Sequence, residues 1–145
     1  MGHCLIAVKE SLPELSNPLG IDGLEFVEYA TSQPQQFGAL LQKLGFAAVA
    51  RHRSREVMLY RQGGMNLIVN AHEPTSATPL LSAFALRVRD AAYAHKHSLD
   101  AGAWDMPTRA SAMELNIPGI HGVADSLIYF VDRYTDFSIY DVDFV

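Results

Sequence analysis

The sequence is poor in cysteine, in net positive charge and in long apolar runs. Its 145 residues contain one cysteine, Cys4, so no disulfide can form within the chain, and this usage fits a reducing cytoplasm. A formal net charge of −5 argues against a nucleic-acid partner, because a phosphate backbone requires a basic surface. The longest early apolar run, Cys4 to Val8, is too short for a secretory signal or a membrane span. We therefore expect a cytoplasmic protein without nucleic-acid or membrane partners.

Apolar residues, by contrast, are abundant. They make up 49% of the sequence, and charged residues make up 19%, which is enough apolar material for a packed core and too little charge for a disordered chain. The length fits one domain. We assign residues 1–20 to an N-terminal lead-in and residues 21–145 to a single domain.

The first half of this domain shows one helical pattern among strand patterns. Ser32 is expected to cap a helix over residues 33–44, whose apolar positions follow the i, i+3, i+4, i+7 spacing of a buried stripe. The stripe consists of Phe37, Leu40, Leu41 and Leu44. Alternating apolar positions between turn residues predict four strands. They cover residues 21–31, 46–53, 56–61 and 65–71.

The second half repeats this order of elements. Asp90 is expected to cap a helix over residues 90–101. Strands are predicted at residues 80–89, 103–108, 113–117 and 127–133, with a final strand near 137–144. A separation of 60 residues relates Gly23 to Ala83 and Leu67 to Leu127 (83 − 23 and 127 − 67). The sequence thus predicts an α+β fold of two βαβββ units, 21–73 and 80–145, which form a cup-shaped mixed sheet with helices on its convex side.

Four segments carry a family resemblance. They are NPLGIDGLEFVEYA (17–30), HRSREVMLYRQGGMNLIVNAHEP (52–74), ALRVRDAAYAHK (85–96) and MELNIPGI…DSLIYFVDRY…SIYDVDF (113–144). They resemble the N-terminal domain of 4-hydroxyphenylpyruvate dioxygenase, a member of the vicinal-oxygen-chelate (glyoxalase/bleomycin resistance) superfamily. The resemblance covers nearly everything after the first 16 residues. One departure is the linker around Pro74 to Leu80, which is shorter than the family pattern.

The resemblance implies an enzyme of tyrosine catabolism that converts 4-hydroxyphenylpyruvate and O₂ to homogentisate and CO₂. In that family a non-haem Fe(II), held by two histidines and one glutamate, lies in a C-terminal domain that would follow Val145. Metal-binding relatives of this fold take their ligands from the first and last strands of each unit. In this sequence the corresponding positions hold Gly23, Val69, Ala83 and Tyr129. The first three cannot coordinate a metal through a side chain, and a neutral tyrosine is a poor ligand for Fe(II).

The six histidines supply no alternative metal site. His95 and His97 lie two residues apart, and on a helix such side chains point about 200° away from each other. We therefore expect no cofactor in this chain and no catalytic residue, and we predict that the 145-residue chain alone is inactive.

Glu25 and Arg87 are the candidate ligand-binding residues, since both lie on first strands of their units. They can pair with each other, or Arg87 can hold a small 2-oxo acid by bidentate hydrogen bonds. Exposed strand edges also favour a homo-oligomer, at least a dimer.

The function that follows from the resemblance is that of a non-metal-binding N-terminal half with a structural and oligomerisation role. Two alternatives remain open. One is a stand-alone protein of the glyoxalase/bleomycin-resistance type that binds a small molecule in a metal-free cup. The other is the dioxygenase-like tail of a bifunctional dehydroshikimate dehydratase.

Overall fold

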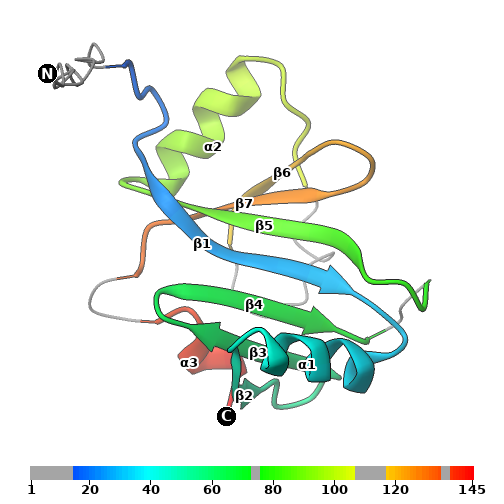
Figure 1. The fold of residues 1–145 in the computed structure, drawn as a ribbon. Helices are drawn as coiled ribbons and strands as arrows, with labels where there is room; N and C mark the ends of the chain where they lie inside the picture. The colour runs from blue at the N-terminus through cyan, green and yellow to red at the C-terminus, as the bar shows by residue number, and fades with distance from the viewer. Residues whose placement is uncertain (1–14, 73–75, 107–116, 135–137) are drawn as a thin grey trace, which may run out of the picture.

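The computed structural model describes residues 15–72, 76–106, 117–134 and 138–145. In chain order their elements are β1 (Ile21–Ala30), α1 (Pro34–Lys43), β2 (Ala47–Arg51), β3 (Val57–Gln62), β4 (Met65–Asn70), β5 (Leu80–Val88), α2 (Ala91–Asp100), β6 (Gly119–His121), β7 (Leu127–Val131) and α3 (Tyr140–Asp143). The strands within the described residues form one seven-stranded sheet of order β2-β3-β4-β1-β5-β7-β6 (Figure 1). No helix in these ranges is long and apolar enough to cross a membrane.

The sheet is built from two halves with the same pairing pattern. Each half places its first strand parallel to its last, β1 beside β4 and β5 beside β7, and the two first strands pair antiparallel in the centre. This is the arrangement expected of two βαβββ units, and it confirms the predicted α+β cup. Of the strand predicted at 103–108, the described residues 103–106 form only a bridge between Asp105 and Ile120. Residues 107–116, which include most of the strand predicted at 113–117, lie outside the described ranges.

Alternating side chains divide the sheet into two apolar faces. On β4, Leu67 and Val69 pack with Leu41 of α1, whereas Ile68 points to the opposite face. On β7, Phe130 packs with residues of α2, whereas Tyr129 and Val131 point the other way. Helices α1 and α2 therefore cover the same, convex face. The other face, which carries Phe26, Ile68, Ala83 and Tyr129, is called the concave face below.

The predicted stripe on α1 is wrong in part. Leu41 is 3% exposed, but Leu40 and Leu44 are 50% and 59% exposed. The buried line of the helix runs instead through Gly38 and Leu41, because the absence of a side chain at Gly38 lets Tyr60 approach the helix closely. This contact turns Leu40 and Leu44 toward solvent.

The start of α1 also differs from the prediction. Gln33, not Ser32, occupies the N-cap position, and it makes no side-chain capping bond. The hydroxyl of the buried Thr31 accepts a hydrogen bond from the Gln33 N–H at 3.1 Å. The cap predicted for α2 is confirmed, since the Asp90 carboxylate accepts from the Tyr93 N–H.

The predicted final strand is wrong as well, because the chain forms the short helix α3 at Tyr140–Asp143. Tyr140 and Phe144, which are both buried, lie four residues apart. A separation of four places side chains on the same face of a helix and of a strand alike, so the sequence pattern did not distinguish the two.

The common separation of 60 residues is likewise wrong for the last strands of the units. Leu67 packs with α1 on the convex face, whereas Leu127 packs against the concave cluster. A shift of one residue in a strand moves a side chain to the other face of the sheet.

Candidate ligand site on the concave face

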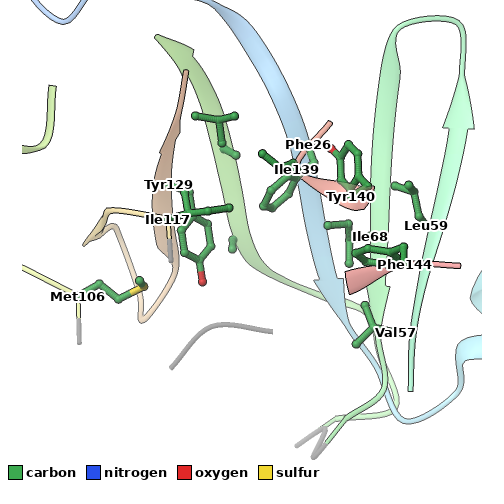
Figure 2. Packing of buried hydrophobic residues seen from close by; sticks show 13 residues of the cluster. Phe26, Val57, Leu59, Ile68, Met106, Ile117, Tyr129, Ile139, Tyr140 and Phe144 are labelled. Atoms are coloured by element: carbon green, nitrogen blue, oxygen red, sulfur yellow. The ribbon is translucent and has the colours of Figure 1, made fainter. Parts of the chain in front are cut away.

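The concave face carries the largest apolar cluster among the described residues, and the C-terminal residues are part of it. The cluster consists of Phe26, Val57, Leu59, Ile68, Ala83, Ala85, Met106, Ile117, Tyr129, Val131, Ile139, Tyr140 and Phe144. Figure 2 shows Ile139, Tyr140 and Phe144 directed toward side chains of the strands. Residues 138–145, called the C-terminal segment below, thus cover the face on which this fold would present a ligand.

Backbone pairing holds the end of the C-terminal segment against β2. Arg51 and Val145 exchange both backbone hydrogen bonds, at 2.8 Å each, and the Arg53 N–H donates to the Asp143 carbonyl at 2.8 Å. His52 and Phe144 form the bridge between these two pairs, with their ring centroids 5.6 Å apart. The segment therefore begins with the helical turn α3 and ends in an extended stretch that pairs with residues 51–53 like an added strand.

His52 shapes the turn that receives this segment. Its ring is 2% exposed, and its Nδ1 accepts hydrogen bonds from the backbone N–H groups of Ser54 and Arg55, both at 3.1 Å. These two hydrogen bonds fix the orientation of the His52 ring within the turn. His52 is thus a structural residue of the turn rather than a metal ligand.

Tyr140 of the C-terminal segment is buried and contacts aromatic and charged side chains. Its ring contacts Phe26 and Phe144 edge-on, with centroid distances of 6.5 and 5.9 Å. The Arg61 guanidinium stands over the ring, 5.9 Å from its centroid, and the hydroxyl donates to the Glu25 carbonyl at 3.4 Å. Burial, and then the negative charge of Glu25, raises the pKa of the Tyr140 hydroxyl far above its ordinary value. Tyr140 is therefore a neutral phenol.

Glu25 and Arg87, the two candidate ligand-binding residues, form an ion pair. Arg87 Nε donates to Glu25 Oε2 at 2.5 Å, and the side chains are 31% and 5% exposed respectively. The Arg87 guanidinium also stands 5.4 Å from the centre of the Tyr134 ring, and the Tyr134 hydroxyl donates to Asp22 Oδ2 at 2.9 Å. Of the two alternatives, the ion pair is the one that the structure contains. A ligand carboxylate at Arg87 would have to compete with Glu25, and such binding stays a prediction.

The four positions expected to correspond to metal ligands do not come together. Ala83 and Tyr129 belong to the concave cluster, but Val69 packs against α1 on the convex face. Ile68, one residue earlier on β4, points into the concave cluster instead. Gly23 has φ +144°, and open space surrounds the place of a side chain. The inward side chains at these positions are thus apolar or phenolic and do not fit Fe(II).

The other acidic and histidine side chains of the described residues do not form a metal site either. Across the described ranges, no three His, Cys, Asp or Glu side chains lie close enough to hold a metal ion. His95 Nε2 hydrogen-bonds to Asp105 Oδ1 at 2.8 Å, and the His97 ring lies against Tyr93. The two histidines therefore have separate partners.

Glu28 is a buried acidic residue that the sequence did not single out. It is 7% exposed, and the Ser82 hydroxyl donates to its Oε2 at 2.6 Å. Burial raises the pKa of its carboxyl, which the hydrogen bond from Ser82 offsets in part. Its spacing of two from the buried Phe26 was the available signal, because a charge at an inward strand position is unusual.

Comparison with known proteins decides the family. Residues 15–145 match the family described as "Hydroxyphenylpyruvate dioxygenase, HPPD, N-terminal". The chain belongs to this family. It is 49% identical over 138 residues to Hemolysin VllY of Vibrio vulnificus (strain CMCP6), a match that covers 88% of this chain and 39% of that protein. It is 41% identical over 138 residues to 4-hydroxyphenylpyruvate dioxygenase of Pseudomonas sp. (strain P.J. 874), covering 89% of this chain and 38% of that enzyme.

Two further relatives are much longer than this chain. A 3-dehydroshikimate dehydratase of Pseudomonas aeruginosa (strain PAO1) is 41% identical over 135 residues, which cover 86% of this chain and 21% of that protein. A solved structure titled xylose isomerase-like TIM barrel/4-hydroxyphenylpyruvate dioxygenase fusion protein superposes with a TM-score of 0.78 and 34% identity, over 89% of this chain and 22% of that chain. The chain thus spans about two fifths or less of the length of these relatives.

Proposed function

We propose that this chain acts as the non-catalytic N-terminal half of a 4-hydroxyphenylpyruvate dioxygenase-like protein. Its role is to support a catalytic domain that supplies the Fe(II) ligands, in a cytoplasmic pathway of tyrosine breakdown. The observation that carries the proposal is the occupied concave face. Where a metal-binding unit of this fold would present ligands, this chain presents Ile68, Ala83 and Tyr129, and Tyr140 and Phe144 pack over them.

The experiment that tests this proposal is an iron-binding measurement. The purified chain is loaded anaerobically with Fe(II), desalted and analysed for metal, and then assayed for homogentisate formation. A full-length 4-hydroxyphenylpyruvate dioxygenase, treated in parallel, serves as the positive control. We expect neither retained iron nor product from the chain. Stoichiometric iron, or homogentisate above the no-protein control, would overturn the non-catalytic role.

A role in assembly is the second part of the proposal. Leu40 and Leu44 lie exposed on α1, and Leu80 and Leu81 lie exposed at the start of β5. Exposed leucines favour contact with another domain or with a second copy. We expect at least a dimer, and light scattering that gives a monomer mass at high concentration would contradict this.

The dehydratase relative and the barrel fusion favour one alternative, in which this domain is the tail of a bifunctional dehydroshikimate dehydratase. The other alternative, a stand-alone small-molecule binder, rests on the partly exposed Arg87. Reading the gene beyond codon 145 and upstream of codon 1 distinguishes the two alternatives from each other and from the dioxygenase-like role. A following domain with two histidines and a glutamate supports the dioxygenase, and a preceding barrel supports the dehydratase. A stop codon at position 146 supports the small-molecule binder.

A further inference from the structure

Tyr140 occupies the concave face in the way a bound ligand would. Its side chain is 5% exposed, although it belongs to a helix of only four residues. Side chains of the sheet surround it: Phe26 lies at its edge and Arg61 over its face. The hydroxyl donates to the Glu25 carbonyl at 3.4 Å.

These contacts are selective for a phenol. Aromatic side chains at the ring edge and a guanidinium over the ring face stabilise any arene. The Glu25 carbonyl, however, accepts the hydrogen bond at the polar end of the slot, so that end requires a donor. A neutral hydroxyl satisfies it, whereas a phenolate or a carboxylate would face the negative charge of Glu25. Arg87 keeps that charge in place by pairing with the Glu25 carboxylate.

We propose that the concave face is a phenol-binding slot and that Tyr140 is its internal ligand. The slot is formed by Phe26, Arg61 and Glu25 of the sheet and is closed by Phe144. The C-terminal segment that delivers Tyr140 is anchored by backbone bonds to residues 51–53. A free phenol therefore gains access only when the Tyr140 ring is removed or withdrawn.

The test is chemical rescue in the full chain. Tyr140→Ala keeps the Cβ and deletes the atoms of one phenol molecule, so phenol is the matching probe. Benzene is the matched probe without the hydroxyl. Phe144→Ala is the matched variant, because it opens a space of benzene shape in the same cluster. Thermal midpoints are measured for wild type and both variants over a concentration series of each probe.

We expect phenol to raise the midpoint of Tyr140→Ala in a saturable manner, since a ligand that binds only the folded state stabilises it by mass action. Benzene should raise it less. Phe144→Ala should show no preference for phenol over benzene, and wild type should respond to neither probe. If Tyr140→Ala does not fold unaided, phenol should restore its near-ultraviolet circular dichroism and benzene should not.

Three outcomes would overturn the proposal. The first is Tyr140→Ala that responds to neither probe, whether folded or unfolded. The second is an equal response to phenol and benzene, which would reduce the slot to an unspecific apolar cavity. The third is a wild-type response as large as that of the variant, which would place phenol binding away from Tyr140.

Discussion

The hydroxyl of Tyr60 lies in the space that a side chain at Gly38 would need. A methyl group at Gly38 would overlap this hydroxyl and would stand 3.1 Å from the Tyr60 Cζ atom. We predict that Gly38→Ala destabilises the protein by about 1–3 kcal/mol through overpacking, although alanine favours a helix by about 1 kcal/mol over glycine. Urea unfolding monitored by circular dichroism measures the change.

Tyr60→Phe provides the control for this prediction. Removing the hydroxyl relieves the worst overlap, so Gly38→Ala should cost less in the Tyr60→Phe background than in wild type. A stabilising Gly38→Ala, or an equal cost in both backgrounds, would show that the helix does not approach Tyr60 closely.

Leu41 should be the leucine of α1 on which stability depends most. It is 3% exposed among Tyr60, Leu67 and Val69, so Leu41→Ala loses buried area and leaves a cavity. The expected loss is about 2–5 kcal/mol. Leu40→Ala and Leu44→Ala, at exposed positions of the same helix, should change stability by roughly 0.5 kcal/mol or less. Equal losses at all three leucines would contradict the observed orientation of α1.

The Glu25–Arg87 pair predicts strong coupling between two substitutions. Arg87→Met leaves the Glu25 carboxylate, 5% exposed, without its cation. Breaking a buried pair from one side costs about 3–5 kcal/mol, and the partial exposure of Arg87 puts the expected loss at the lower end. Glu25→Gln combined with Arg87→Met should recover much of that loss, because no buried charge remains. Additive effects in the double-mutant cycle would mean that the two residues act separately.

A different substitution of Arg87, to alanine, tests its predicted ligand role. Calorimetric titration with 4-hydroxyphenylpyruvate should give a binding heat with wild type that is lost with Arg87→Ala. Equal heats for the two proteins would place Arg87 outside any ligand site.

Glu28 should make stability fall as the pH rises. Burial raises the pKa of its carboxyl in the folded state above the ordinary value of 4.5, so the folded protein holds this proton to higher pH than the unfolded chain. Stability is then unaffected below the unfolded pKa and declines between the unfolded and the folded pKa. Above the folded pKa the penalty is constant. Glu28→Gln, which can still accept from Ser82, should therefore raise the thermal midpoint at neutral pH and have little effect near pH 3.

Glu56→Gln is the matched control, since Glu56 is exposed. Its thermal midpoint should follow that of wild type across the pH series. A Glu28→Gln variant that is less stable than wild type at neutral pH would mean that the ionised carboxylate is favoured in the fold.

The sequence correctly predicted those elements whose residue pattern fits only one type of secondary structure. Asp90 is expected to cap a helix and does so, and the strands predicted at 56–61 and 65–71 are present as β3 and β4. The C-terminal segment was not predicted correctly, because the spacing of Tyr140 and Phe144 fits a helix and a strand equally. Val69 was placed on the wrong face because one residue of misalignment reverses a strand. The Glu25–Arg87 contact joins distant residues, and the sequence could offer it only as one of two alternatives.

The pairing of Arg51 with Val145 has a consequence for how the chain folds. It joins an early strand to the last residue, so the loop it closes spans most of the domain, and such distant contacts form slowly. During synthesis on the ribosome, the apolar side chains of Phe26 and Ile68 remain without Tyr140 and Phe144 until the end of this sequence emerges. The nascent domain is consequently most prone to aggregation just before that point, and chaperones that recognise apolar surface have their clearest target there.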